Sequence, residues 1–342
     1  MDEETDIHIL GEDPAFLDVM DQVSRVAPLD RPVLVIGERG TGKELIAARL
    51  HFLSRRWGQA FVKLNCAALP ETLVDAELFG VEPGAFTGAV RRAGRFEAAD
   101  RGSLFLDEIG TLSAAAQEKL LRIVEYGVFE RLGSGRSIHV DVRLIGATNV
   151  DLAAEAGAGR FRADLLDRLA FDVITVPPLR ARAEDIALLA DHFGRAMASE
   201  LDWPAFPGFA DGAMAALRSH GWPGNVRELK NVVERAVYRW GDPDRPVAAL
   251  QFDPFDSPWR PQPARAAQAP DPSPATGEGA AAGDVEPAPS LPYDMRAAVA
   301  AYEKRLLGAA FAACRFNQRE TAAALGLSYD QFRHAAKKHD LL

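Results

Sequence analysis

The stretch that decides the fold of this chain is Val33–Glu44, VLVIGERGTGKE, in which four apolar residues precede a glycine-rich turn and a helix-favouring segment. It fits the G-x-x-x-x-G-K pattern, where glycines let backbone N–H groups converge on phosphates and the lysine adds a charge at a helix N-terminus. The sequence therefore predicts a nucleoside triphosphate site. Its expected ligand residues are Gly37, Glu38, Arg39, Gly40, Thr41, Gly42, Lys43 and Glu44.

A second acidic site is expected because Glu44 stands where most phosphate loops carry a Ser or Thr that helps to hold Mg²⁺. The segment Ser103–Asp107, SLFLD, predicts a buried strand that ends in Asp107 and Glu108. Asp107 would hold Mg²⁺ through water, and Glu108 would polarise the attacking water. Asn65, at the end of a strand predicted over 61–65, would hydrogen-bond Glu108 and hold it away from that water. The alternative is that the two acids only form a helix-capping turn.

Further strands are expected over 142–148 and 171–176, which completes an α/β fold with a five-stranded parallel sheet. The first of them ends in Thr148 and Asn149, polar groups placed to sense the γ-phosphate. The segment around Gly133–Ser137 predicts a hairpin tip.

In FRADLLDRL, Arg162 and Arg168 are six residues apart and do not share a helix face. We therefore expect them to approach a site from a bend or an end.

The segment WPGNVREL predicts the start of a helix within a region that is helical from 184 to 240. Asn225 is a suitable N-cap, and Glu228 three residues later completes a capping-box pattern. Arg227 lies in the first turn, either as a phosphate sensor or as a charge on a solvated helix face.

Composition sets the outer limits on function. The chain of 342 residues can hold two or three domains, and its net charge of −10 argues against uniform coating of nucleic acid. Cys66 and Cys314 are far apart without metal or redox spacing, which is typical of small core residues in a reducing cytosol. Neither an apolar run of membrane-spanning length nor the basic start of a signal peptide occurs in the sequence, so we expect a cytoplasmic protein.

The expected domain order is a short tail (1–10), an α/β subdomain (11–180), a helical lid (181–253), a flexible linker (254–292) and a helical module (293–342). The linker holds 10 of the 22 prolines and few residues that could be buried.

The helical module is predicted to contain a helix-turn-helix. After an apolar helical stripe from Met295 to Phe311, we expect one helix over 318–325, a turn at Gly326, and a second helix that Ser328 caps. Between Arg315 and Lys338 there are five basic residues and two acidic ones, so the module is basic inside an acidic chain. Such a patch is either a DNA-binding surface or a solvated face. If it binds DNA, its side chains could contact either bases or phosphates. The candidates are Arg319, Ser328, Tyr329, Gln331, Arg333, Lys337 and Lys338.

The joint order of GERGTGKE, GAFTGA, LFLDE, FRADLLDRL and WPGNVREL resembles the AAA+ activators of sigma-54 RNA polymerase, the bacterial enhancer-binding proteins, over about 11–240. The terminal module resembles their Fis-type helix-turn-helix. The resemblance implies a hexameric AAA+ ATPase with a helical lid, which uses ATP and Mg²⁺, binds enhancer DNA and opens the promoter. It also implies that Lys43 binds phosphates, that Glu108 orients water with Asn65 as its switch, that Arg162 and Arg168 reach the neighbouring subunit's ATP, and that Arg227 is a second sensor.

GAFTGA by itself has the composition of an ordinary turn. In the family it is the signature of the loop that contacts sigma-54, so the resemblance implies this contact for Gly84, Ala85, Phe86, Thr87, Gly88 and Ala89, with the 133–137 loop beside them.

The residues before the phosphate loop are too few for a regulatory domain, so we expect a second protein to restrain the ATPase. Resemblance points to phage shock protein A and a membrane-stress operon. Trp57, beside Arg55 and Arg56, is the candidate contact, although it could instead cover the edge of the core. Two other functions stay open: a DNA-binding protein that uses ATP only as a structural ligand, and an AAA+ remodeller of another kind.

Overall fold

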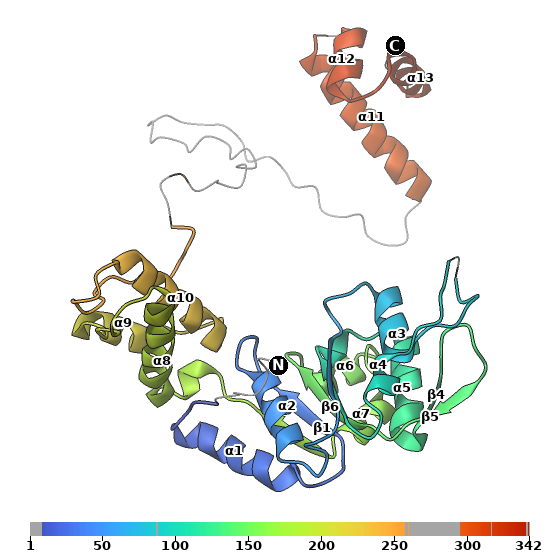
Figure 1. The fold of residues 1–342 in the computed structure, drawn as a ribbon. Coiled ribbons are helices and arrows are strands. Elements are labelled where there is room, and N and C mark those ends of the chain that lie inside the picture. Colours follow the sequence, from blue (N-terminus) through green and yellow to red (C-terminus); the bar gives the residue numbers. More distant parts are fainter. Residues whose placement is uncertain are drawn as a thin grey trace. The chain divides into compact units, whose positions relative to one another are not determined.

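The computed structural model describes residues 9–86, 88–256, 259, 295–315, 317–339 and 341, and divides into two compact units, Met1–Arg260 and Pro261–Leu342 (Figure 1). Most of the predicted tail and of the predicted linker lie outside the described residues. Among the helices that the structure describes, none combines the length and the apolar character that crossing a bilayer requires.

The first unit is built on a five-stranded sheet in which every strand pair is parallel, as predicted. The strand order is β2 (Phe61–Asn65), β3 (Ser103–Asp107), β6 (Arg143–Thr148), β1 (Val33–Ile36) and β7 (Asp172–Thr175). The register places Asn65 opposite Asp107 and Ile36 opposite Thr148. The carboxyl ends of four strands thus bring the predicted polar residues to one edge of the sheet, next to the phosphate loop.

Helices cover both faces of this sheet. Residues of β1 alternate between the two cores: Val33 and Val35 pack with α1 and α2, whereas Leu34 packs with the helices of the other face. Burial on both faces explains why the strands are continuous apolar runs. The elements are α1 (Pro14–Val26), α2 (Lys43–Phe52), α3 (Glu71–Phe79), α4 (Arg95–Ala98), η1 (Ile109–Thr111), α5 (Ala114–Tyr126), α6 (Leu152–Gly157), α7 (Ala163–Leu169) and η2 (Leu179–Ala181), with the hairpin of β4 (Val128–Glu130) and β5 (Ser137–His139) at the predicted tip.

The lid contains α8 (Glu184–Glu200), α9 (Asp211–Ser219) and α10 (Asn225–Trp240). Its core is a separate apolar cluster that includes the fully buried Trp222, with Leu229 and Val233 from α10. Arg182 and Asp185, both buried, join the lid to the α/β part: Asp185 accepts the backbone N–H groups of Glu12 and Asp13, and Arg182 donates to the carbonyl of Thr41.

The second unit consists of α11 (Met295–Ala313), α12 (Gln318–Ala324) and α13 (Tyr329–Lys338). Asn317 caps α12, Ser328 caps α13 in a capping box, and Gly326 makes the turn with φ +67°. Phe332 is fully buried against Phe311. Of the predicted stripe of α11, Leu307 and Phe311 are buried, whereas Val299, Tyr302 and Leu306 are exposed.

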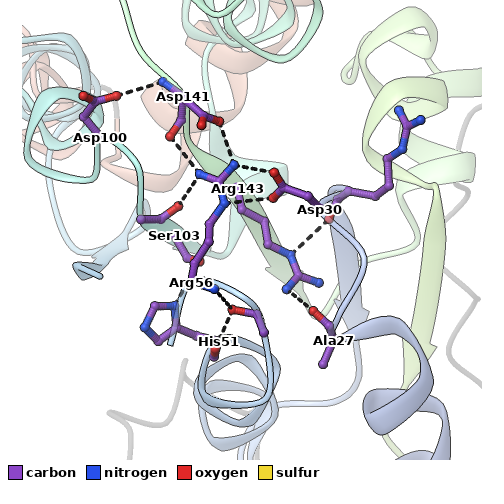
Figure 2. Close-up of polar contacts among 11 residues, drawn as sticks. Ala27, Asp30, His51, Arg56, Asp100, Ser103, Asp141 and Arg143 are labelled. Atoms are coloured by element: carbon purple, nitrogen blue, oxygen red, sulfur yellow. Dashed lines mark hydrogen bonds and ion pairs between the residues drawn. The ribbon is translucent and has the colours of Figure 1, made fainter. Parts of the chain in front are cut away.

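Two arginines organise the opposite, amino-terminal edge of the sheet (Figure 2). Arg143 is buried and donates to backbone carbonyls, at 2.7 Å to Ala27 and 3.2 Å to Arg31, with longer bonds to Val26 and Leu50. Arg56 bridges the exposed carboxylates of Asp30 and Asp141, and it also donates to the carbonyls of Gly102 and Asp141 at 3.1 and 2.8 Å. Burial lowers the pKa of Arg143, and the two carboxylates help to raise that of Arg56 against its own desolvation.

Candidate nucleotide site

The phosphate loop connects β1 to α2 and opens on a cleft of ≈ 890 Å³. Gly40 and Gly42 have positive φ angles of +78° and +95°, a conformation that favours glycine. Lys43 is the first residue of α2, and its Nζ donates to the carbonyls of Gly37 and Glu38 at 2.9 and 3.2 Å. Lys43 and the loop residues Arg39, Gly40, Gly42 and Glu44 line the cleft. The fold therefore places a helix N-terminus and a lysine at the cleft, an arrangement suited to an anion.

Asp107 and Glu108 line the same cleft from the end of β3. One oxygen of Asp107 accepts the N–H of Glu108 at 3.0 Å, and the other accepts the Asn65 amide at 3.1 Å. Glu108 has a left-handed backbone, φ 54° and ψ 44°, and caps η1. A strained conformation at a strand end is a recurrent property of functional residues.

The predicted bond between Asn65 and Glu108 is wrong for this structure, because the Asn65 amide binds Asp107 instead. The parallel register explains the difference, since it places Asn65 directly opposite Asp107. The Asn65 carbonyl oxygen is also occupied, as it accepts the N–H of Ala67.

Charges converge on Lys43 from both parts of the first unit. Burial lowers the pKa of the Lys43 ammonium, the nearby Glu108 and Asp107 carboxylates oppose that shift, and the Arg227 and Arg39 guanidiniums reinforce it. Arg227, from the first turn of α10, lines the cleft. The site thus surrounds one lysine with two acids and two arginines, an arrangement suited to a polyphosphate and a divalent cation. Among the described residues, no group of three His, Cys, Asp or Glu forms a separate metal cluster.

The predicted N-cap at Asn225 is wrong. The cap is Gly224, whose N–H donates to Glu228 at 2.7 Å, and Asn225 is the first helical residue. Asn225 has a positive φ of 54° and is fully buried, and its side chain reaches away from its own helix to the phosphate loop. Gly224 has no side chain that could accept an N–H group of the first turn, and Glu228 accepts the N–H of Gly224 itself.

Thr148 and Asn149 lie at the predicted strand end but do not line the cleft. Thr148 is buried; its carbonyl accepts the N–H of Gly37, and its hydroxyl accepts that of Val150. Thr148 therefore ties β6 to the start of the phosphate loop.

Arg162 and Arg168 lie at the two ends of α7, as their spacing predicts. Arg162 pairs with Asp164 at 2.7 Å and Arg168 with Glu125 at 2.9 Å, and both side chains are exposed. Neither lines this chain's own cleft.

A small apolar pocket of ≈ 100 Å³ adjoins the phosphate loop, and the sequence analysis did not find it. Its walls suit the flat face of a nucleobase, and Gly42 and Leu45 line both this pocket and the phosphate cleft. No local signal marks it, because its apolar walls come from separate segments of the chain: Ile9, Leu10, Phe16, Leu45, Ile46, Leu189, Phe193 and Val226.

The GAFTGA loop is described except for Thr87, which lies outside the described residues. Phe86 is 56% exposed, and Gly84 and Gly88 have positive φ angles. The loop lies beside the β4–β5 hairpin: a Cβ on Gly133 would stand 2.7 Å from Ala85. Arg131 in the hairpin binds Glu82 and Glu97, which fixes the base of the loop.

Trp57 is 68% exposed, so the alternative that it covers the edge of the core is wrong.

In the second unit, every predicted DNA-binding side chain is exposed. Ser328 and Gln331 are engaged in the capping box, Tyr329 donates to Gln318, and Lys338 pairs with Glu303.

Comparison with known proteins identifies two family matches: the sigma-54 interaction domain over residues 9–175 and the AAA+ ATPase lid domain over residues 180–249. The Psp operon transcriptional activator of Escherichia coli (strain K12) is 52% identical over 335 residues, 98% of each chain. The Nif-specific regulatory protein of Azotobacter vinelandii is 51% identical over 67% of this chain and 44% of its own length. NtrX from Brucella abortus, solved with ADP, has a TM-score of 0.67 and 30% identity, covering 98% of this chain and 69% of NtrX.

NtrX has also been solved with ATP, at a TM-score of 0.66. The match over 98% of both chains extends the likeness to the Psp operon activator beyond the ATPase and across the helical second unit. As the order of its motifs predicts, the chain belongs to the sigma-54-dependent transcriptional activators, a family of AAA+ ATPases.

Proposed function

We propose that this chain binds Mg²⁺-ATP in the cleft beside Lys43 and hydrolyses it to remodel the closed complex of sigma-54 RNA polymerase at a membrane-stress operon. The observation that carries the proposal is the meeting of Lys43, Asp107, Glu108 and Arg227 around one cleft. A passive nucleotide site needs no acid pair, so this arrangement favours turnover over a purely structural ligand.

Within the cleft, Asp107 would hold Mg²⁺ through water, since carboxylate oxygens are the ligands that this cation prefers. When bound, Mg²⁺ would neutralise charge on the β- and γ-phosphates. Glu108 would orient the attacking water, and Asn65 would position Asp107, whose carboxylate its amide binds. Glu108→Gln should retain ATP binding and lose hydrolysis.

Arg162 and Arg168 would act on the ATP of a neighbouring subunit in a hexameric ring. Their exposure at the ends of α7, away from their own cleft, supports this role. An arginine supplied in trans contributes roughly 10³ to 10⁵ in rate. Arg168→Ala should therefore be inactive alone. When it is mixed with excess Glu108→Gln, an Arg168→Ala subunit keeps its own Glu108 and receives Arg168 from its Glu108→Gln neighbour, so hydrolysis should return at that site.

The decisive experiment is transcription in vitro from a sigma-54 promoter, with ATP or with a non-hydrolysable analogue. The proposal expects open complexes only with ATP. Equal activity with the analogue would favour the structural-ligand alternative.

The exposed Phe86 and its neighbour Thr87 would contact sigma-54 at the tip of the GAFTGA loop. Thr87→Ala should abolish binding to sigma-54 and leave ATP hydrolysis largely intact. An AAA+ remodeller of another kind would not bind sigma-54 either with or without the substitution.

The second unit would hold enhancer DNA through α13. Arg333 and Lys337 are exposed on this helix. Because phosphate contacts release counterions, Lys337→Ala should lower the salt dependence of DNA affinity by about one charge. Arg333→Ala distinguishes base reading from phosphate contact by its effect on sequence preference.

A negative regulator, phage shock protein A, would bind at Trp57. The turn after α2 presents this ring to solvent, and the neighbouring Arg56 is anchored by Asp30 and Asp141 (Figure 2). Trp57→Ala should escape inhibition and keep its ATPase activity, whereas unchanged inhibition would remove this surface from the proposal.

A further inference from the structure

Glu38, the second residue of the phosphate loop, is bound by a residue at the junction between the sheet and the lid. Arg180, in η2 directly after β7, donates to both Glu38 carboxylate oxygens, at 2.6 and 2.9 Å. Such a bidentate arginine–carboxylate pair fixes geometry as well as charge. The contact spans 142 residues of sequence.

Asn225 adds a second attachment from the lid itself. Its amide nitrogen donates to the Glu38 carboxylate at 3.1 Å and to the Arg39 carbonyl at 3.0 Å, and its oxygen accepts the N–H of Leu179 at 2.8 Å. The side chain is fully buried and its backbone has φ 54°. One residue thus joins the phosphate loop, the junction before the lid and the start of α10.

The backbones of the loop and the lid also touch at this point. The N–H of Val226 donates to the Gly40 carbonyl at 3.0 Å, and a Cβ on Gly40 would stand only 2.3 Å from the Gly224 carbonyl oxygen. Arg227 is the next residue after Val226. The position of Arg227 is therefore tied directly to the phosphate loop rather than to the lid core alone.

We propose that Glu38, Arg180 and Asn225 form a loop–lid latch that positions Arg227 over the phosphates of ATP. The latch rests on the proposed role of Arg227 in binding nucleotide. Glu38, Arg180 and Asn225 are positioning residues in this scheme, and Arg227 is the group that touches the ligand. Preorganising Arg227 before ATP arrives reduces the ordering that binding requires.

The state of the Glu38–Arg180 pair does not change in the physiological range. The hydrogen bonds from Arg180 and Asn225 lower the pKa of Glu38 to about 2, so its carboxylate is ionised at neutral pH. Both side chains of the ion pair are half-exposed, at 51% and 42%, and water screens them. Exposed pairs of this kind change an equilibrium by about fivefold at most, which sets the scale of the expected effect.

The test measures ATP affinity of the full chain by titration calorimetry in four variants: wild type, Arg180→Ala, Arg227→Ala and the double variant. The latch predicts that Arg180→Ala weakens ATP binding about three- to fivefold, and that it has no further effect once Arg227 is Ala. Arg180→Lys, which keeps the charge without the fork, should recover part of the loss. Arg195→Ala is the matched control, since Arg195 pairs with Asp191 at 2.6 Å on the exposed face of α8.

An equal loss in both backgrounds would mean that Arg180 acts without Arg227, which overturns the latch. Unchanged affinity in Arg180→Ala, with weakened binding in Arg227→Ala, overturns the latch alone. Unchanged affinity in Arg227→Ala removes the sensor role of Arg227, and the latch falls with it.

Discussion

Arg143 should be a major stabilising residue of the α/β part although it lies at the edge of the sheet opposite the nucleotide cleft. Its guanidinium is buried and its partners are neutral carbonyls at the ends of α1 and α2 and in the turn before β1. Figure 2 shows the bond to Ala27. Carbonyls in the last turn of a helix have no partner within the helix, and a cation there also complements the helix dipole. We consider the replacement Arg143→Met, which keeps much of the volume and removes the donors.

The magnitude follows from the acceptors that lose their donor. The carbonyls of Ala27 and Arg31 accept the two shortest of these bonds, and each acceptor left unsatisfied costs about 1 to 3 kcal/mol. Part of this loss is offset because the variant no longer buries a charge. We therefore expect a net loss of about 3 kcal/mol, or roughly 6 to 12 °C in Tm. Arg143→Lys keeps the charge with fewer directed donors and should fall between the two.

The assay is calorimetric unfolding of the full chain at low and high salt, with ATP affinity measured in parallel. Arg56→Met is the matched control from the same cluster, because Arg56 pairs with exposed carboxylates that water can solvate, and the carbonyls of Gly102 and Asp141 to which it also donates each keep a backbone N–H donor. Its loss should be about 1 kcal/mol and should shrink at high salt, whereas the Arg143 effect should not. A change in stability below about 0.5 kcal/mol for Arg143→Met, within the range of ordinary surface substitutions, would refute the reasoning.

Three further predictions concern single positions. Gly40→Ala should lose ATP affinity, because its Cβ meets the Gly224 carbonyl at 2.3 Å; Gly208→Ala, with a similar φ of +83° and no atom within 4 Å, reports backbone strain alone. Burial beside Asp107 raises the pKa of Cys66 to about 12, so a thiol reagent at pH 8 should modify only Cys314 in the native chain and both thiols in denaturant. Rapid modification of both cysteines in the native chain would contradict this. Phe332→Ala should destabilise the second unit by about 3 to 5 kcal/mol and abolish DNA binding in a mobility-shift assay, while ATP hydrolysis persists.

The sheet could be predicted from the sequence because each of its strands carries a local signal. A buried parallel strand is a short apolar run, and the chain places a polar residue at the end of such runs, at Asn65, Asp107 and Thr148. A helix start was equally local where a cap acts on its own helix, as at Ser328. Backbone propensity and side-chain chemistry agree at these positions.

Polar residues that act across the fold could not be predicted in this way. Asn225 has the side chain and spacing of an N-cap, yet the side-chain oxygen that would cap α10 accepts the N–H of Leu179, while the amide nitrogen donates to Glu38 and Arg39. The same atoms satisfy either demand, and only the packing of the lid against the phosphate loop decides between them. The contact between Arg180 and Glu38 could not be predicted either. An arginine shortly after two prolines can adopt many solvated conformations, and its partner here lies 142 residues away in the sequence.

The Asn65 contact shows how a correct set of residues can be joined by a wrong bond. The sequence places Asn65, Asp107 and Glu108 at one sheet edge, and a switch needs the amide to reach the second acid. In this structure the register gives the amide to the first acid, while Glu108 occupies a left-handed turn beyond the strand. A one-residue difference along β3 therefore separates two arrangements of the same three side chains.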